Sequence, residues 1–176
     1  MITPEQFLSN EIEWGISATN EAFIELTRQT VKQLNIPFKT VLDYGAGTGV
    51  YSNAYHQAGY DVYCYEIWDA HKNYIKTNYP HINIIDIPIT TDLMNFIEVA
   101  EHMTDKELNS LFKSIKPEYI LFSSTSNKTS WDEDWGHINV KEQSEWIKFF
   151  TSKGYILIKE LNYPTNYTKL WQRTSK

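Results

Sequence analysis

Three glycines, each separated by one residue, follow a short apolar segment in the first third of the chain. The segment is Val41-Leu42-Asp43-Tyr44, and the glycines are Gly45, Gly47 and Gly49. Glycine permits a tight turn and lets the backbone approach a ligand closely. The free N–H groups at the start of a following helix favour anionic ligand groups. The pattern therefore predicts a strand, a nucleotide-binding turn and a helix that begins at Val50.

The rest of the chain alternates short apolar segments with segments of helical periodicity. The expected strands are 40–44, 61–65, 82–85, 93–97, 119–123, 155–161 and 167–173, and the expected helices are 22–34, 50–57, 68–78, 104–116 and 141–153. This alternation indicates a doubly wound, Rossmann-like α/β fold with a seven-stranded, mostly parallel sheet. The last two strands are too close in sequence for a helical crossover, so we expect a C-terminal antiparallel hairpin.

The length of 176 residues predicts a single domain over 1–176, with an N-terminal helical cap at 1–36 and a Rossmann-like core at 40–174. Neither a signal peptide nor an apolar run of membrane-spanning length is seen, so we expect a cytoplasmic protein. The net charge of −6 and the dispersed basic residues make a nucleic-acid partner unexpected. The only cysteine, Cys64, lies in an apolar run and is expected to be a buried structural thiol.

A carboxylate directly follows the strand expected at 61–65. Glu66 occupies the place where a carboxylate can bind both hydroxyls of a ribose. The dinucleotide-binding pattern needs a further glycine at position 50, which is Val50 here, and this disfavours a dehydrogenase.

The residues from Asp43 to Gly49 resemble the first motif, D-x-G-x-G-x-G, of the class I S-adenosylmethionine-dependent methyltransferases. The resemblance extends over roughly Thr40 to Arg173 and implies S-adenosylmethionine as the cofactor. In that family Glu66 would bind the ribose, Ile67 and Trp68 would flank the adenine, and Asp86 would lie near the adenine amino group. The implied cofactor-binding residues are Asp43, Gly45, Gly47, Gly49, Glu66, Ile67, Trp68 and Asp86. Because only 87–92 separates the third and fourth strands, we expect an open adenine pocket.

A second pattern follows the fourth expected strand. Glu98, Glu101 and His102 are spaced so that one face of a helical turn would carry all three. Carboxylate oxygens and imidazole nitrogens are usual ligands of divalent metals. The E-x-x-E-H pattern resembles that of the ubiquinone-biosynthesis O-methyltransferases and the methyltransferases of small-RNA 3′ ends. The resemblance implies a metal site for Mg²⁺ or another divalent ion formed by Glu98, Glu101 and His102, with His137 as the later histidine.

The two histidines have alternative roles. His102 is a candidate metal ligand, general base or scaffold hydrogen-bonding group, because E-H at this place also occurs in class I methyltransferases without a known metal. His137 is a candidate general base, metal ligand or loop-capping residue. We therefore predict His102 and His137 as catalytic residues. The polar segment 124–139, which contains Trp131 and Trp135, is the expected substrate lid, and the chain near Trp14 is expected to fold over the cofactor.

These features favour an O-methyltransferase that acts on a small molecule or a sugar-like hydroxyl. One alternative is a metal-dependent RNA ribose 2′-O-methyltransferase, which the acidic charge disfavours. Another is a non-catalytic cofactor-binding partner subunit, whose mark would be a degraded glycine motif. DNA amino-methyltransferases usually carry D/N-P-P-Y/F where this chain reads Glu98-Val99-Ala100-Glu101.

Overall fold

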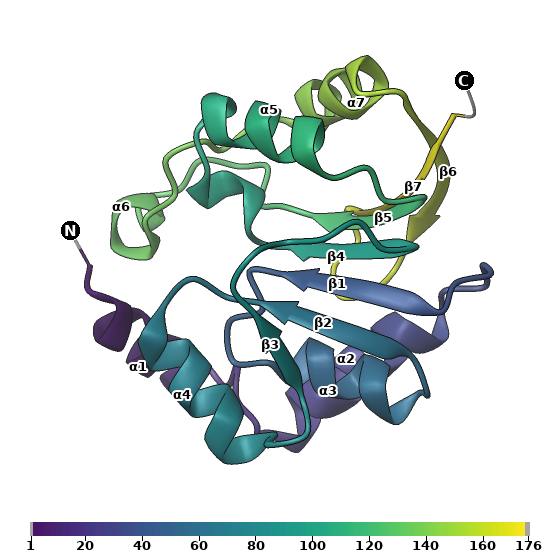
Figure 1. Ribbon diagram of the computed structural model, residues 1–176. Helices are drawn as coiled ribbons and strands as arrows, with labels where there is room; N and C mark the ends of the chain where they lie inside the picture. The colour runs from purple at the N-terminus through teal and green to yellow at the C-terminus, as the bar shows by residue number, and fades with distance from the viewer. Residues whose placement is uncertain (1, 175–176) are drawn as a thin grey trace.

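The computed structural model describes residues 2–174, apart from the side chain of Glu133. Its centre is a seven-stranded sheet with the order β3-β2-β1-β4-β5-β7-β6 (Figure 1). The strands are β1 Thr40–Tyr44, β2 Asp61–Tyr65, β3 Asn83–Ile85, β4 Leu93–Ile97, β5 Tyr119–Ser123, β6 Tyr155–Leu161 and β7 Thr168–Arg173. All seven expected strands are therefore present, within one residue of their expected bounds.

Helices cover both faces of the sheet. They are α1 Pro4–Glu13, α2 Glu21–Lys32, α3 Val50–Gln57, α4 Asp69–Asn78, α5 Asp105–Ser114, α6 Asp132–Trp135 and α7 Gln143–Ser152, with a 3₁₀ turn, η1, at Ala100–His102. Figure 1 shows α2, α3 and α4 on one face and α5 and α7 on the other. The doubly wound arrangement expected from the sequence is thus confirmed.

The sheet is parallel from β3 to β5 and antiparallel at its other edge. β1 pairs with β2 and β4, β2 with β3, and β4 with β5, all in parallel. β7 pairs antiparallel with both β5 and β6, which confirms the C-terminal hairpin and inserts its second strand into the sheet. Because the strand order reverses between β1 and β4, a ligand crevice is expected at the carboxyl ends of these two strands.

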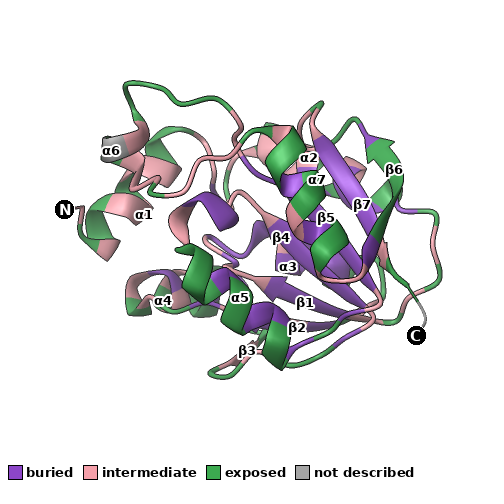
Figure 2. Cartoon of the chain, turned by 90° about the horizontal axis from the view of Figure 1, so that it is seen from above, coloured by how far each residue is buried: buried purple, intermediate pink, exposed green. Residues whose placement is uncertain are grey.

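Alternate residues of the strands enter two separate cores, because successive side chains point to opposite faces of a sheet. Leu42, Met94 and Phe122 pack toward α5 and α7, whereas Val41 and Leu121 pack toward α2 and α3. Figure 2 shows β1, β4, β5 and β7 largely buried and β6 largely exposed, while α1 and α6 carry intermediate and exposed residues. The central strands therefore form the buried core of the sheet, and α1 and α6 lie at the margin of the molecule.

Two helices, α1 within the expected N-terminal helical cap and α6, had no bounds predicted from the sequence. Thr3 and Gln6 form a capping box that begins α1, since Gln6 N donates to Thr3 Oγ1 and Thr3 N donates to Gln6 Oε1. The short helix α6 lies within the segment expected as a polar loop.

Between β3 and β4 the structure has no helix, as expected from the short 87–92 connection. No helix in the described part of the chain is both long and apolar enough to cross a membrane.

Phe122 provides a test of the core between the sheet and α7. Its side chain is fully buried and its ring centroid lies 5.0 Å from that of Trp146 and 4.7 Å from that of Phe150. Replacement of Phe122 by Ala is expected to lower the free energy of unfolding by about 3–5 kcal/mol, because it leaves a cavity. Urea unfolding measures this loss. Ile158→Ala, at an exposed position on β6, is the control and should change the free energy by no more than about 0.5 kcal/mol.

Candidate active site

The glycine turn after β1 packs closely against its neighbours. Gly45, Gly47 and Gly49 have φ angles of 70°, 54° and 75°, which side-chain-bearing residues rarely adopt. A Cβ on Gly45 would lie 2.7 Å from Val99 Cγ2, and one on Gly49 would lie 2.8 Å from Ile75 Cγ1. The turn therefore contacts both α4 and the segment that follows β4, and only glycine fits these contacts.

Asp43 lies beneath this turn. Its carboxylate is 2% exposed and accepts hydrogen bonds from Ser52 Oγ at 2.6 Å and from Asn95 Nδ2 at 2.7 Å. Burial raises the pKa of the Asp43 carboxyl above its ordinary value, although the two hydrogen bonds oppose this rise. Through these bonds Asp43 joins β1 to α3 and β4, so its side chain supports the turn from below.

Glu66 lies against the turn from the end of β2. Its side chain accepts hydrogen bonds from Gly47 N at 2.9 Å, from Ile67 N at 2.7 Å and from Trp68 N at 2.9 Å. The residue is 5% exposed, whereas Ile67 is 63% exposed and Trp68 is half-buried. The structure thus brings Glu66 to the glycine turn, as expected for a carboxylate that binds a ribose.

Asp86 lies elsewhere in the structure. Its side chain is 91% exposed and its carboxylate lies 3.6 Å from Lys72 Nζ on α4. No hydrogen bond in the described residues links it to the glycine turn. Its role at the adenine stays a prediction.

The segment after β4 is not an α-helical turn. Glu98 has a φ of 51°, and the 3₁₀ turn begins two residues later at Ala100. The common helical face expected for Glu98, Glu101 and His102 is therefore not formed. A side-chain-bearing residue in this conformation carries strain, which proteins retain mostly at functional sites.

Polar groups at the end of β5 bring the two glutamates together instead. Glu98 accepts hydrogen bonds from Ser123 Oγ and from Thr125 N, the latter at 3.0 Å. Glu101 accepts a hydrogen bond from Ser124 Oγ at 3.0 Å and a longer one from Thr125 N at 3.4 Å. Both carboxylates therefore share Thr125 N and lie next to each other.

The electrostatics of this cluster disfavour two ionised glutamates side by side. Glu101 is fully buried, and burial together with the neighbouring Glu98 raises its pKa well above the ordinary value. No lysine or arginine in the described chain forms an ion pair with either glutamate. Burial, with a smaller contribution from His137, lowers the pKa of His102 to about 4, so its imidazole is neutral near pH 7. Neutral imidazole is the form that binds metals.

His137 reaches this cluster from the segment between β5 and α7. Its ring centroid lies 4.9 Å from that of His102, and its Nδ1 lies 3.0 Å from Asp132 Oδ1. One potential ligand atom from each of Glu101, His102 and His137 lies within 4.8 Å of the others. The structure thus brings together three of the four predicted metal ligands, and Glu98 stands beside Glu101 outside this group.

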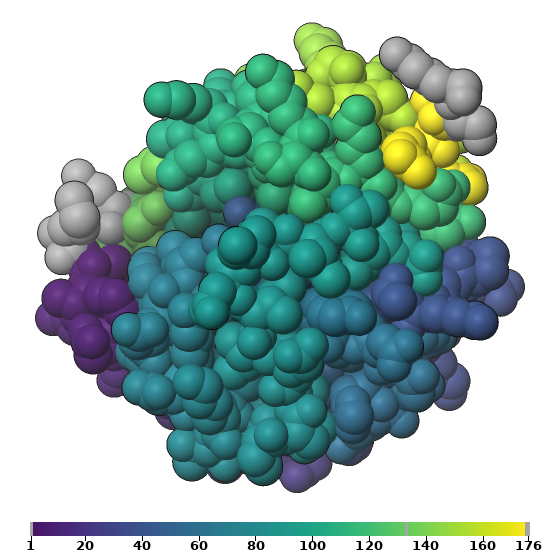
Figure 3. Space-filling view, viewed as in Figure 1, coloured from purple at the N-terminus to yellow at the C-terminus, as the bar shows by residue number. Residues whose placement is uncertain are grey.

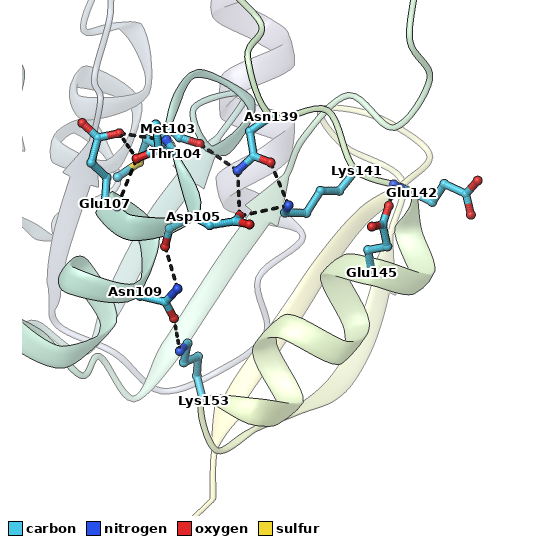
Figure 4. A network of polar contacts seen from close by, with 10 residues as sticks. All are labelled: Met103, Thr104, Asp105, Glu107, Asn109, Asn139, Lys141, Glu142, Glu145 and Lys153. Atoms are coloured by element: carbon cyan, nitrogen blue, oxygen red, sulfur yellow. Dashed lines mark hydrogen bonds and ion pairs between the residues drawn. The ribbon is translucent and has the colours of Figure 1, made fainter.

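A polar network holds the His137 segment in place (Figure 4). Ile138 N and Asn139 N both donate to Glu101 O at 2.9 Å. The Asn139 side chain donates to Met103 O at 2.8 Å and to Asp105 Oδ1 at 3.0 Å, and Lys141 Nζ lies 3.0 Å from Asp105 Oδ1. The start of α5 therefore anchors the segment that carries His137.

Helix α1 packs against α4, against the segments that follow β2 and β4, and against α6. The Phe7 ring packs edge-on against Trp68, His102 and Trp135, with centroid distances of 5.1, 5.7 and 5.5 Å. Figure 3 shows the surface of α1 beside that of α4, with the green segment around α6 next to it. The sequence analysis placed a cap here but did not identify Phe7. The capping box at Thr3 signals the helix, but nothing local indicates where it packs.

Glu11 and His71 are further residues that the sequence analysis did not assign. Glu11 Oε2 lies 2.7 Å from His71 Nε2, and the two side chains are 12% and 1% exposed. A Cβ on Gly47 would lie 3.1 Å from Glu11 Oε1, so Glu11 faces the glycine turn. These residues are sixty positions apart, and no spacing rule connects them.

The comparisons with known proteins agree with this geometry. A family model described as methyltransferase domain matches residues 18–162. No curated protein sequence matches the chain. The chain therefore belongs to the methyltransferase domain family, and its fold is that of the class I S-adenosylmethionine-dependent methyltransferases.

Solved structures share the fold at low sequence identity. A putative methyltransferase from Haloferax volcanii, in complex with the Trm112 methyltransferase activator, has a TM-score of 0.76 and 11% identity, over 99% of this chain and 100% of that one. The mitomycin 7-O-methyltransferase MmcR has a TM-score of 0.63 and 15% identity, and the match covers 88% of this chain and 55% of that enzyme. Magnesium protoporphyrin IX methyltransferase from Synechocystis PCC 6803 has a TM-score of 0.60 and 16% identity, and the match covers 85% of this chain and 80% of that enzyme. This chain thus spans about half of the mitomycin enzyme.

The glycine turn allows binding and folding to be separated. In Gly49→Ala the new Cβ meets Ile75 and the backbone stays left-handed, so we expect a loss of stability greater than the roughly 1–2 kcal/mol of the backbone alone. In Gly47→Ala the backbone also stays left-handed and lowers stability by roughly 1–2 kcal/mol, but only the end of the flexible Glu11 side chain is near the new Cβ. This variant should fold but bind S-adenosylmethionine roughly ten-fold more weakly, about 1.4 kcal/mol. Thermal unfolding and calorimetry measure the two effects, and unchanged binding in Gly47→Ala would contradict the prediction.

Proposed function

We propose that this methyltransferase transfers a methyl group to a hydroxyl of a small molecule, and that Glu101, His102 and His137 hold a divalent metal ion beside the reacting oxygen. The observation that carries the proposal is the convergence of these three side chains beside the glycine turn. Val99 contacts Gly45, so the metal-binding segment and the proposed cofactor-binding turn are in direct contact. Cofactor and acceptor sites that adjoin in this way suit a direct transfer.

The cofactor is proposed to lie over the glycine turn, with Glu66 on its ribose. Glu66 is already oriented by the N–H groups of Gly47, Ile67 and Trp68, which fixes its carboxylate at the end of β2. The exposed Ile67 side chain and the Trp68 ring offer apolar surface for the adenine. Asp43 would act through the backbone that it supports.

Methyl transfer from a sulfonium is an in-line displacement. The acceptor oxygen attacks the methyl carbon, the carbon–sulfur bond breaks, and its electron pair stays on the sulfur, which becomes a neutral thioether. The hydroxyl proton must also leave the oxygen. The protein contributes mainly by holding the two reactants in line, with the acceptor hydroxyl between the cofactor and the cluster after β4.

The cluster fits a metal by its donor set. One buried carboxylate and two imidazoles lie within coordination reach, and among the described residues no lysine or arginine pairs with Glu98 or Glu101. A bound divalent ion would lower the pKa of the acceptor hydroxyl, so that the nucleophile forms near neutral pH. Asp132 accepts or shares a hydrogen bond at His137 Nδ1, which leaves Nε2 for the ion. Without a metal, neutral His102 is the candidate general base.

The surroundings of the cluster favour an acceptor with a flat, apolar face. Trp14 packs edge-on against Trp135 of α6, and the exposed Trp131 and Ile138 lie on the same segment as His137. Such residues mark binding surfaces when they gather on one side of a molecule. Aromatic side chains stack on both aromatic rings and sugar rings, so both acceptor types fit this surface.

The metal site has a direct test. MgCl₂, MnCl₂ or ZnCl₂ should raise the unfolding temperature of the wild type, since a ligand at one hundred times its dissociation constant stabilises by about 2.7 kcal/mol. The effect should disappear in Glu101→Gln and in His137→Gln but persist in His56→Gln, which alters an exposed histidine on α3. Differential scanning fluorimetry provides the measurement. A wild type that binds S-adenosylmethionine but shows no metal effect would overturn the metal site.

The role of Glu66 has a separate test. Glu66→Ala removes charge-assisted hydrogen bonds to the ribose, and we expect binding to weaken by roughly 1.5–3 kcal/mol for each bond lost. Calorimetric titration with S-adenosylmethionine measures this loss, and Glu66→Gln should show a smaller one because it keeps the side-chain shape. Unchanged affinity in the folded Glu66→Ala protein would remove Glu66 from the site.

A further inference from the structure

Glu11 lies where a bound cofactor would approach the glycine turn. Its Oε1 lies 3.1 Å from the place of a Cβ on Gly47, whose N–H donates to Glu66. Phe7, one helical turn earlier on α1, contacts both Trp68 and His102, so the same helix face spans from the end of β2 to the cluster after β4. Glu11 therefore faces the proposed cofactor site beside Glu66, and Phe7 on the same helix face reaches the cluster after β4.

Three acidic side chains gather around the glycine turn, and no lysine or arginine in the part of the chain that the structure describes pairs with them. Glu11 and Glu66 are close enough to repel each other, and Asp43 lies beneath them. Among the described residues the only ionic partner of Glu11 is His71, and Glu66 and Asp43 have none. Burial of the Glu11 carboxylate, opposed by its bond to His71, raises its pKa above the ordinary value. A cationic ligand would relieve this cost.

His71 holds Glu11 in this position. Its side chain is 1% exposed on α4, and its Nε2 lies 2.7 Å from Glu11 Oε2. Its Nδ1 has no hydrogen-bond partner among the described residues, so Glu11 is the one polar contact that orients the ring. A buried imidazole with a single carboxylate partner fixes that carboxylate, because removal of either group leaves the other unsatisfied.

We propose that Glu11, positioned by His71, recognises the positive charge on the sulfur of S-adenosylmethionine and so distinguishes the cofactor from its product. S-adenosylmethionine carries a sulfonium, whereas S-adenosylhomocysteine carries a neutral thioether and is otherwise the same molecule. Loss of the methyl group therefore removes the charge that Glu11 attracts, which favours release of the product. This inference rests on the proposed placement of the cofactor over the glycine turn.

The test compares three ligands by calorimetric titration: S-adenosylmethionine, S-adenosylhomocysteine and sinefungin, in which a protonated amine replaces the methylsulfonium group. Glu11→Gln should weaken the two charged ligands roughly ten- to a hundred-fold while S-adenosylhomocysteine changes little, since hydrogen bonds and contacts to charged groups contribute about 1.5–3 kcal/mol. Glu13→Gln is the matched control, because it removes the same charge from an exposed position on α1. It should leave all three affinities unchanged.

His71→Gln tests the positioning role. It should reduce the preference for the charged ligands in the same direction as Glu11→Gln, but by a smaller factor, because Glu11 is still present. A merely structural role would weaken all three ligands equally. Equal losses in Glu11→Gln, or tighter binding of S-adenosylmethionine, would overturn the inference, and the latter would identify Glu11 as an obstacle to the cofactor. A wild type that binds none of the three ligands would instead overturn the proposed cofactor site.

Discussion

The close approach of the glycine turn to the segment after β4 is the contact on which the crevice depends. Val99 occupies the space that a Cβ on Gly45 would fill, and Ile75 occupies the corresponding space at Gly49. These contacts join the end of β1 to α4 and to the segment after β4, at the point where the strand order reverses. A side chain on either glycine would separate the proposed cofactor and acceptor sites. The glycines are therefore needed both for the backbone turn and for the proposed methyl transfer.

Buried carboxylates lie on both sides of this contact, and neither group has a lysine or arginine partner in the described chain. Glu11 and Glu66 face the turn on one side, and Glu98 and Glu101 converge on the other. Buried charge without a counterion lowers stability. Ligands that supply positive charge, a sulfonium on one side and a metal ion on the other, would offset this cost. The two proposals thus share one electrostatic cause.

Sequence periodicity was sufficient to predict the elements whose signals are local. The glycine turn, Glu66 and the hairpin of β6 and β7 follow from spacing alone, because each depends on neighbouring residues. The backbone conformation of the segment around Glu98 could not be predicted from the spacing. Its spacing fits a helix, but hydroxyl and N–H groups at the end of β5 hold Glu98 in a left-handed conformation. The contact between Glu11 and His71 joins distant segments, so no local pattern predicts it.

Helix α1 and the segment that carries His137 differ in the number of hydrogen bonds that attach them to the rest of the fold. The segment that carries His137 is attached to the sheet side of the crevice, because Ile138 N and Asn139 N donate to Glu101 O and Asn139 also bonds to the start of α5. Helix α1 has no buried residues of its own and contacts the crevice through Phe7 and Glu11. Opening of α1 would break the packing of Phe7 and the Glu11–His71 pair but leave the cluster after β4 in place, whereas opening of the His137 segment would dismantle that cluster. The cofactor is thus expected to enter beneath α1, past the Glu11 carboxylate that its charge would attract.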